Sequence, residues 1–345
     1  MCISRKSDKI GAQIFRDAPM ADCAVSPKVK AALLRLSRDP GGTASPYTGR
    51  KITMHKIYSN KLHILIFLLP ALILFCGVLI APIGASLYYS FFDWKGIGAK
   101  TFIGLANYKE LFTSNSIGFM KALRNSLLLA LLSVFLQLPL ALGLALTLGK
   151  NIKGERMFLS VYFMPVLIST VVIGQLWLKI YNPDYGILNV FLRKIGLESW
   201  TRIWLGDKNT ALGAVFVPTL WQYVGYHMLL LYAGVKSVPM ELREAAMLDG
   251  ATDAQVNRYI VLPYIKPILR ISVIFAVTGS LKSFDLIYVL TNGGPRHATE
   301  VPSTLMINML FLRNRYGMGS TIAVMLIILC FGFALLISAM FREEE

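Results

Sequence analysis

Charged side chains are scarce in this sequence. Lys, Arg, Asp and Glu make up 16% of the 345 residues, whereas hydrophobic residues make up 55%. This balance excludes a soluble domain of such length. The long stretches without any charge are 62–92, 125–149, 157–178, 210–235 and 316–341. Because a helix needs roughly 20 apolar residues to cross the hydrocarbon core of a bilayer, these stretches predict membrane spans.

A sixth apolar stretch, 267–292, is interrupted by Arg270 near its start and by Lys282 and Asp285 further on. Its length and its Ile, Leu, Val and Phe content still predict a span. Backbone groups in lipid must be paired internally, so stretches this apolar can only be helices. We therefore expect an all-α membrane domain at 61–342, with six transmembrane helices and a cytoplasmic loop between the fourth and fifth.

Cysteine is also rare, and a phosphate-binding loop is missing. The four cysteines, Cys2, Cys23, Cys76 and Cys330, have no metal-ligand spacing, so we expect no metal site. No stretch matches G-x-x-x-x-G-K-[ST]. The chain itself should therefore neither bind nor hydrolyse ATP, and we expect no cofactor on it.

Acidic residues are outnumbered, 19 against 35 Lys and Arg, which gives a net charge of +16. Such a surplus can indicate nucleic-acid binding, but its distribution argues against that. Twelve basic and four acidic residues precede position 62. Further bases fill the loops after the second and fourth spans: Lys150, Lys153, Arg156, Lys236, Arg243, Arg258, Lys266 and Arg270.

This pattern follows the positive-inside rule, although the loops 93–124 and 182–209 also carry bases. It predicts a multi-pass protein of a bacterial cell membrane with both termini in the cytoplasm. Residues 1–60 are polar, basic and rich in Gly, Pro and Ser, and we expect them to form a disordered cytoplasmic tail.

The loop after the fourth span, "ELREAAMLDGATDAQVNRYIVLP", is unusually ordered for a connection. Good helix formers fill 240–249, and Gly250 follows as a left-handed cap. Thr252 and Gln255 have the spacing of a capping box, which starts a second helix. We expect that helix to run to about Ile260, where Pro263 stops it. By these residues alone the loop is either a solvated amphipathic helix or a docking surface.

The spacing of this loop closely resembles the EAA loop of ABC-importer permeases. Its defining positions are occupied by Glu244, Ala245, Ala246, Asp249, Gly250, Ile260, Leu262 and Pro263. "FIGLANYKELF" at 102–112 and "VLTNGGP" at 289–295 are similar to the carbohydrate-uptake subfamily, which includes the maltose and glycerol-3-phosphate permeases. The resemblance covers 61–342 and leaves out the tail.

The resemblance implies a division of labour. The loop would be a coupling helix that inserts into a separate ATPase subunit, which binds ATP and Mg²⁺. Two such ATP-binding cassette subunits, a second homologous permease and an extracytoplasmic solute-binding protein would complete the assembly. The segment "TNGGPRHATE" at 291–300 should be an external turn, since Asn-Gly-Gly-Pro cannot continue a helix. The family suggests that this turn belongs to the outer gate or to the contact with the binding protein.

Polar side chains within the spans are the candidate solute site, because such residues tend to face a cavity or the bundle interior. Thr219, Gln222, Tyr223 and Tyr226 share one helical face in the fourth span. The fifth span crowds Ser280, Lys282 and Ser283 together. Hydroxyls, an amide and aromatic rings suit a sugar, and by resemblance to the maltose permease these positions line the transport pathway. The alternative for the fourth-span residues is helix–helix packing through satisfied polar groups.

Lys282 itself has two interpretations. With Asp285 at i+3 it can form an intramembrane ion pair, or it can receive an anionic solute. Overall, the sequence predicts a permease subunit that imports a sugar, with an oligosaccharide as the expected type. A polyol phosphate or an acidic (uronate) oligosaccharide is the alternative. An ion-coupled secondary transporter would need acidic relays in its spans, where only Asp285 qualifies. An intramembrane enzyme lacks a catalytic set, because His227 and Asp285 lie on different spans.

Overall fold

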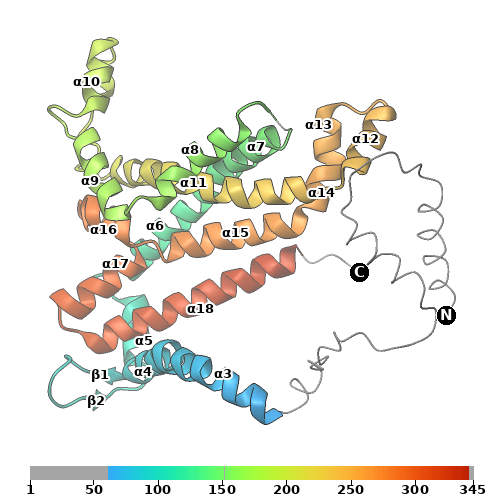
Figure 1. The fold of residues 1–345 in the computed structure, drawn as a ribbon. Helices are drawn as coiled ribbons and strands as arrows, with labels where there is room; N and C mark the ends of the chain where they lie inside the picture. Colours follow the sequence, from blue (N-terminus) through green and yellow to red (C-terminus); the bar gives the residue numbers. More distant parts are fainter. Residues whose placement is uncertain (1–60, 151, 342–345) are drawn as a thin grey trace, which may run out of the picture. The chain divides into compact units, whose positions relative to one another are not determined.

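The computed structural model describes residues 61–150 and 152–341 (Figure 1). Its contacts divide the chain into one unit that ends at Ile73 and a second that starts at Leu74. Within the described part, the first unit holds only the beginning of helix α3 (Lys61–Phe75). The basic tail predicted at 1–60 lies outside the described residues.

The second unit is helical apart from one small antiparallel sheet in its described part, in which β1 pairs with β2 and Phe92 lies opposite Phe102. The strands are β1 (Phe92–Asp93) and β2 (Thr101–Phe102). The α-helices are α4 (Ala81–Tyr89), α5 (Ala106–Thr113), α6 (Phe119–Leu132), α7 (Leu138–Leu148), α8 (Glu155–Leu167), α9 (Thr170–Ile180), α10 (Ile187–Lys194), α11 (Ala211–Ser237), α12 (Met240–Leu248), α13 (Asp253–Val256), α14 (Leu262–Tyr264), α15 (Lys266–Leu281), α16 (Asp285–Thr291), α17 (Pro302–Ile307) and α18 (Tyr316–Met340). Wider π-helical turns occur at η1 (Cys76–Ile80), η2 (Ser133–Gln137), η4 (Asn257–Val261) and η5 (Asn308–Leu312), and η3 (Glu198–Trp200) is a 3₁₀ turn.

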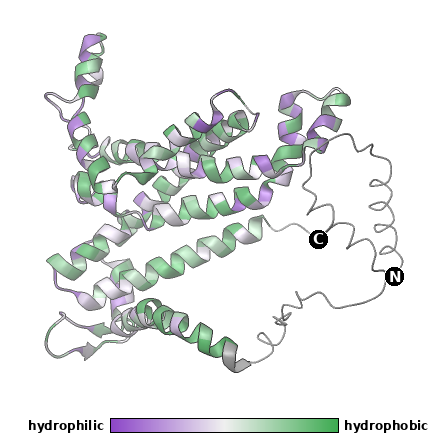
Figure 2. Cartoon of the chain, viewed as in Figure 1, coloured by the Kyte–Doolittle hydropathy of each residue, from purple (hydrophilic) through white to green (hydrophobic). Residues whose placement is uncertain are grey.

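Four helical stretches in the described chain are long and apolar enough to cross a membrane: Ile64–Tyr89, Phe119–Leu148, Lys266–Thr291 and Tyr316–Met340. Figure 2 shows hydrophobic residues along most of α18, whereas hydrophilic residues gather on α12 and α13. A fifth span is present if the bent pair of α8 and α9 crosses as one unit. The structure thus supports four to five spans, and the count of six remains a prediction.

The third predicted span, 157–178, differs from a single straight helix. It consists of α8 and α9, which meet at an angle of 94°. Ile168 between them has an extended backbone, with φ −81° and ψ 138°. Pro165 lies in the last turn of α8 and cannot donate a backbone hydrogen bond there. The segment is therefore a broken span or a re-entrant loop.

The fourth predicted span corresponds to α11, a continuous helix of 27 residues. It is long enough to cross a membrane, but it is not among the helices that are apolar enough to do so. The cause is the polar stretch between Thr219 and His227, which carries the residues proposed from the sequence to meet a solute. The residues that lower the hydropathy of this helix thus include the four that the sequence assigned to the transport pathway.

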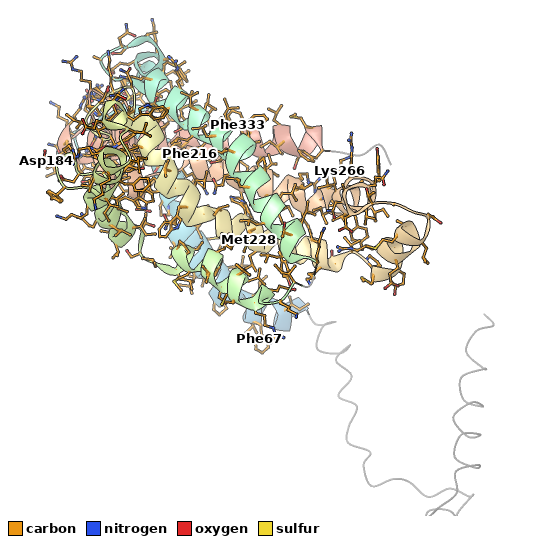
Figure 3. All side chains as sticks on the ribbon, turned by 90° about the horizontal axis from the view of Figure 1, so that it is seen from above. Phe67, Asp184, Phe216, Met228, Lys266 and Phe333 are labelled. Atoms are coloured by element: carbon orange, nitrogen blue, oxygen red, sulfur yellow. The ribbon has the colours of Figure 1, made fainter. Side chains whose placement is uncertain are left out.

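Helix α11 packs closely against α7 and α8. Ala141 and Ala145 of α7 are fully buried in the cluster that contains Met228 and Leu231 of α11. Gly225 approaches α8 so closely that an added Cβ atom would lie 1.9 Å from the Tyr162 carbonyl oxygen. Small residues at such crossings allow helix backbones to approach each other in membranes. Figure 3 shows Met228 and Phe216 along α11 among the side chains of the neighbouring helices.

Candidate functional site

The α12–α13 segment has the local structure that its sequence predicts. Helix α12 ends at Leu248, and Gly250 follows in the left-handed region with φ 85°. Thr252 then caps α13. The backbone nitrogen of Gln255 donates to Thr252 Oγ1 over 3.4 Å, and the backbone nitrogen of Thr252 donates to Gln255 Oε1 over 2.7 Å. These two bonds confirm the predicted capping box.

Pro263 does not end the second helix, which is a correction to the sequence prediction. The helical path continues through the π turn η4 into α14, which ends at Tyr264. Pro263 lies in the first turn of α14, where a backbone N–H needs no helical partner. A proline in this position is compatible with a continued helical path.

The residues of the predicted EAA loop divide into two groups. Ala246, Ile260 and Leu262 pack against the buried cluster that includes Val256 and Val261. The others are exposed: Glu244, Ala245, Asp249, Gly250 and Pro263. The apolar side chains of α12 are exposed too, and Leu248 is 89% accessible. One side of the loop is therefore fixed to the protein, while the other presents small, acidic and apolar groups outward.

Two polar links hold this loop to the neighbouring helices, and a third joins two of those helices to each other. The Arg243 guanidinium of α12 donates to the carbonyl oxygen of Val235 in the last turns of α11. Lys150, which follows α7, forms an ion pair with Asp253 of α13 with 2.6 Å between Nζ and Oδ2. Next to the loop, Glu155 at the start of α8 accepts hydrogen bonds from Tyr232 and Lys236, which joins α8 to the end of α11. The loop is thus attached to the same helix that carries the polar stripe.

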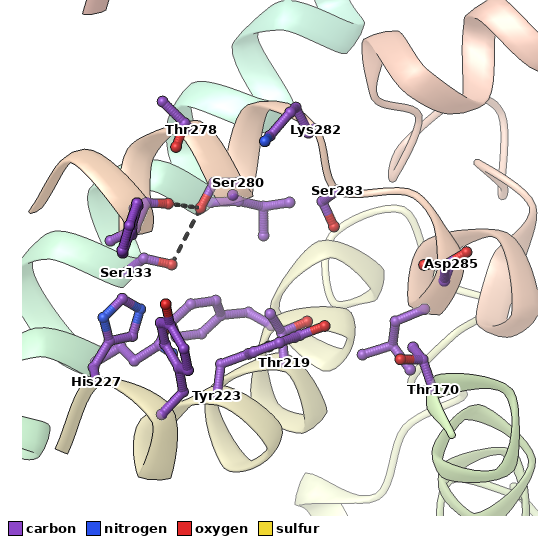
Figure 4. A pocket seen from close by; sticks show the side chains of 18 of the residues that line it. Ser133, Thr170, Thr219, Tyr223, His227, Thr278, Ser280, Lys282, Ser283 and Asp285 are labelled. Atoms are coloured by element: carbon purple, nitrogen blue, oxygen red, sulfur yellow. Dashed lines mark hydrogen bonds between the residues drawn. The ribbon is translucent and has the colours of Figure 1, made fainter. Parts of the chain in front are cut away.

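A cavity of about 490 Å³ lies beside that stripe (Figure 4). It is bounded by α6, η2, α8, α9, α11, α15, α16 and the linker between α15 and α16. Hydroxyl groups dominate its polar lining: Ser133, Thr170, Thr219, Tyr223, Tyr226, Thr278, Ser280 and Ser283. Aromatic rings of Phe216, Phe275 and Phe284 also line it. Hydroxyls that can donate and accept, together with flat apolar faces, can bind a polyhydroxylated molecule.

The cavity brings together six of the seven side chains that the sequence assigned to the pathway, namely Thr219, Tyr223, Tyr226, Ser280, Lys282 and Ser283. Gln222 is the exception. It is buried, and its Nε2 donates to Thr170 Oγ1 over 3.1 Å. Gln222 thus connects α11 to α9, while its Oε1 has no hydrogen-bond partner among the described residues.

Lys282 and Asp285 do not form the ion pair that their spacing suggested. No such pair occurs among the described residues. The reason is a break in the helix, since α15 ends at Leu281 and α16 starts at Asp285. In Figure 4 the two side chains lie apart, with Ser283 between them. The i, i+3 rule applies within one helix, and here the two residues flank a linker.

Comparisons with known proteins identify the family. The family described as "Binding-protein-dependent transport system inner membrane component" matches residues 137–342. The chain belongs to this family of ABC transporter permeases. It is 38% identical over 292 residues to the "Probable ABC transporter permease protein YurN" of Bacillus subtilis, which covers 84% of this chain and 99% of that protein. It is 31% identical to the "Trehalose/maltose transport system permease protein MalF" of Thermococcus litoralis, covering 78% of this chain and 90% of that protein.

The fold of this permease also matches a solved structure. A bacterial ABC transporter "involved in the import of the acidic polysaccharide alginate" superposes with a TM-score of 0.72 at 24% identity, over 84% of this chain and 98% of that one. At this identity the likeness concerns the fold. The chain is thus a non-catalytic membrane component of the carbohydrate-uptake type, which replaces the alternatives of a secondary transporter and an intramembrane enzyme.

The end of the permease opposite α12 is built around the 291–300 segment. Helix α16 ends at Thr291, as the Asn-Gly-Gly-Pro motif predicts, and Asn292 is left-handed with φ 47°. Asn125 of α6 holds the segment by donating from Nδ2 to the carbonyl oxygens of Ala298, over 3.0 Å, and Glu300, over 2.8 Å. The carboxylate of Glu300 is buried and meets His297 Nδ1 at 2.6 Å. The turn is therefore a firmly packed segment rather than a loose loop.

A second polar link at this end joins α5 to the start of α18. The Arg315 guanidinium donates to both carboxylate oxygens of Glu110, over 2.8 and 2.7 Å. These hydrogen bonds lower the pKa of Glu110 from its ordinary 4.5. Helix α5 lies within the stretch 102–112 that resembles the carbohydrate-uptake subfamily, so this pair fixes that stretch to α18.

Sequence reasoning missed several lining residues. Ser133 and Gln137 of η2 lie four positions apart in the predicted second span, and Thr170 starts α9. The i, i+4 spacing of two polar groups in an otherwise apolar stretch was the available signal for the first pair. Thr170 had no comparable signal, because its place depends on the bend between α8 and α9.

Proposed function

We propose that this permease is one half of an importer that carries a sugar, most simply an oligosaccharide, across the membrane. The observation that carries the proposal is the hydroxyl-rich cavity along α11. Relatives support the solute class, since one is named as a trehalose/maltose permease and another as a "Diacetylchitobiose uptake system permease protein". A second, homologous permease would complete the pathway around the cavity.

The α12–α13 loop is the proposed contact with the ATPase. Its outward side presents Leu248, Ala245 and Glu244, while its inward side is fixed to the permease core. A helix with an exposed apolar residue and small neighbours can insert into a groove of another protein. Two ATPase subunits that bind ATP and Mg²⁺ would pull on this helix when they close. The movement would switch the permease between two rigid arrangements.

This proposal includes six membrane-spanning segments with both termini in the cytoplasm. The bent α8–α9 pair and the polar helix α11 would provide the two crossings beyond the four clearly apolar ones. The cavity residues would then lie within the bilayer, and the 291–300 segment would face the extracytoplasmic binding protein. A cysteine-accessibility map of Leu248 and Arg296 tests this arrangement, because membrane-impermeant reagents should label the two positions from opposite sides.

The decisive experiment is reconstitution of the permease with its partner subunits in nanodiscs. ATP hydrolysis is measured with a solute-binding protein that is empty or loaded with different oligosaccharides. Stimulation by a sugar-loaded binding protein supports the proposal, and Leu248→Asp should abolish the stimulation without removing the permease from the membrane. If no ATPase co-purifies with the unmodified permease, the docking role of α12 is wrong.

A further inference from the structure

Lys282 occupies a special place in the cavity. It lies in the linker between α15 and α16, its side chain is exposed, and it is one of the lining residues. No acidic side chain in the described part of the chain forms an ion pair with it. Cations within membrane segments are costly and commonly have a partner or a solute to meet. Among the described residues no acidic side chain pairs with the lysine, so its charge is available to a solute.

The local backbone explains how a positive charge is tolerated here. Lys282 directly follows the last turn of α15, a helix of 16 residues. The carbonyl ends of a helix favour a cation at this position. They leave the ammonium hydrogens of Lys282 available, because a partial negative charge attracts the cation without forming an ion pair.

Asp285 is the acidic residue of the lining, and its charge is balanced in a different way. It is the first residue of α16, where unpaired backbone N–H groups favour an anion. Figure 4 shows its carboxylate away from Lys282, on the side of Thr170. The cavity thus has one cationic side and one acidic side instead of a neutral pair.

The groups around Lys282 suit a sugar acid. Ser283 and Thr278 place hydroxyls in the same lining, and the rings of Phe284 and Tyr288 stack at 5.1 Å close to the linker. The lining contains no arginine. A phosphate dianion is typically held by several cations or by bidentate arginine, whereas one ammonium matches the single charge of a carboxylate.

We propose that the solute of this permease is an acidic oligosaccharide and that Lys282 receives a uronate carboxylate in the cavity. This inference rests on the proposed function as a sugar importer and names its substrate class. Hydroxyl groups on α11 and α15 bind the sugar hydroxyls, and the Phe284 ring covers a C–H face of the sugar ring. Lys282 then discriminates between a sugar acid and its neutral counterpart.

The test uses the complete assembly in proteoliposomes with its binding protein. The probes are a trigalacturonate, the neutral trisaccharide obtained by reducing its carboxyl groups, and glycerol phosphate. Uptake of each labelled probe is measured for the unmodified permease and for Lys282→Met, Lys282→Gln and Lys282→Arg. Lys208→Met, an exposed lysine outside the cavity, is the matched control for a general loss of positive charge.

We expect uptake of the trigalacturonate by the unmodified permease. Lys282→Met and Lys282→Gln should lower it by about tenfold or more, the loss expected for a charge-assisted hydrogen bond. Uptake of the trigalacturonate by Lys282→Arg and by Lys208→Met should stay within about twofold of the unmodified permease, since both variants keep a cation in the cavity. Sugar-independent ATP hydrolysis reports whether each variant has assembled.

Several results would overturn this inference while leaving sugar import intact. They are uptake of the neutral trisaccharide but not of the acid, or an unchanged uptake of the acid by both Lys282→Met and Lys282→Gln. Preferential uptake of glycerol phosphate would replace the uronate by a phosphate. If no sugar of either kind is taken up or stimulates ATP hydrolysis, the proposed function fails, and the substrate class fails with it.

Discussion

Replacing Gly225 by alanine should separate two helices that the cavity depends on. Gly225 lies in α11 and faces α8, and its neighbours Tyr223 and Tyr226 line the cavity. A Cβ atom would lie 1.9 Å from the carbonyl oxygen of Tyr162 and 3.0 Å from the backbone nitrogen of Phe163. Both are backbone atoms, so no side-chain rotation can remove the clash.

The size of the effect follows from the geometry. Ordinary contact begins near 3.4 Å, so α8 must retreat by about 1.5 Å from α11. Overpacking of this kind costs up to about 3 kcal/mol, and here the buried cluster around Met228 moves as well. Alanine regains about 1 kcal/mol through its better helix propensity. We therefore expect a net destabilisation of about 2 kcal/mol.

Gly213→Ala is the matched control. Gly213 lies in the same helix, and nothing approaches its added Cβ within 4 Å. That variant gains the same propensity without a clash, so its free energy of unfolding should rise by up to about 1 kcal/mol. Relative to the unmodified protein, the free energy of unfolding should fall by about 2 kcal/mol in Gly225→Ala and rise by up to about 1 kcal/mol in Gly213→Ala. The two variants should therefore differ by about 3 kcal/mol.

The free energy of unfolding can be measured by titrating the purified permease in mixed micelles with a denaturing detergent. Tryptophan fluorescence is a suitable signal, because Trp221 of α11 packs against Trp177 of α9 with ring centroids 6.3 Å apart. If Gly225→Ala is as stable as Gly213→Ala, α8 and α11 do not approach each other as closely as described. The interpretation of the cavity wall would then be wrong.

Three further predictions concern the two ends of the permease. Glu110→Gln should lower the free energy of unfolding at pH 7 by about 0.5–1 kcal/mol, a small value because the ion pair with Arg315 is partly exposed to water. Since the pKa of Glu110 is lowered from 4.5 in the folded state, this difference should be complete above pH 4.5 and disappear as the pH falls below it; an equal difference in titrations at pH 7 and pH 3 would contradict the pairing. Gly250→Val places a β-branched residue at φ 85° and should lower the number of sugars imported per ATP hydrolysed, whereas an unchanged ratio would argue against coupling through this loop. Thr252→Ala removes the cap of α13 at a cost of about 1 kcal/mol, which should speed amide hydrogen exchange at Asp253–Val256; unaltered exchange would mean that the cap contributes nothing.

The sequence was most informative where structure follows from local rules. The end of α12, the left-handed Gly250 and the capping box of Thr252 each depend on fewer than about five neighbouring residues, and all were predicted. The end of α16 at Thr291 belongs to the same class. In each case a short-range hydrogen bond or a backbone conformation determines the outcome.

Predictions that needed distant partners were less complete. The 94° bend between α8 and α9 could not be derived from Pro165 alone, and it brings Thr170 to the cavity and to Gln222. The polar stripe of α11 indicated one face of a helix but could not show that its members divide between the cavity and α9. Likewise, the spacing of Lys282 and Asp285 predicted a contact that exists only if the helix is unbroken.

Helix α11 connects the cavity to α12, the proposed contact with the ATPase. Its middle supplies Tyr223 and Tyr226 to the cavity, and its end leads through Val238 and Pro239 directly into α12. Arg243 donates to the carbonyl oxygen of Val235 across this joint, which ties α12 to the last turns of α11. Under the proposed function, we therefore expect a force on α12 to move α11 and the cavity wall together. The exposed ion pair of Lys150 and Asp253 contributes little by comparison, because solvent screens it and it can break during such a movement.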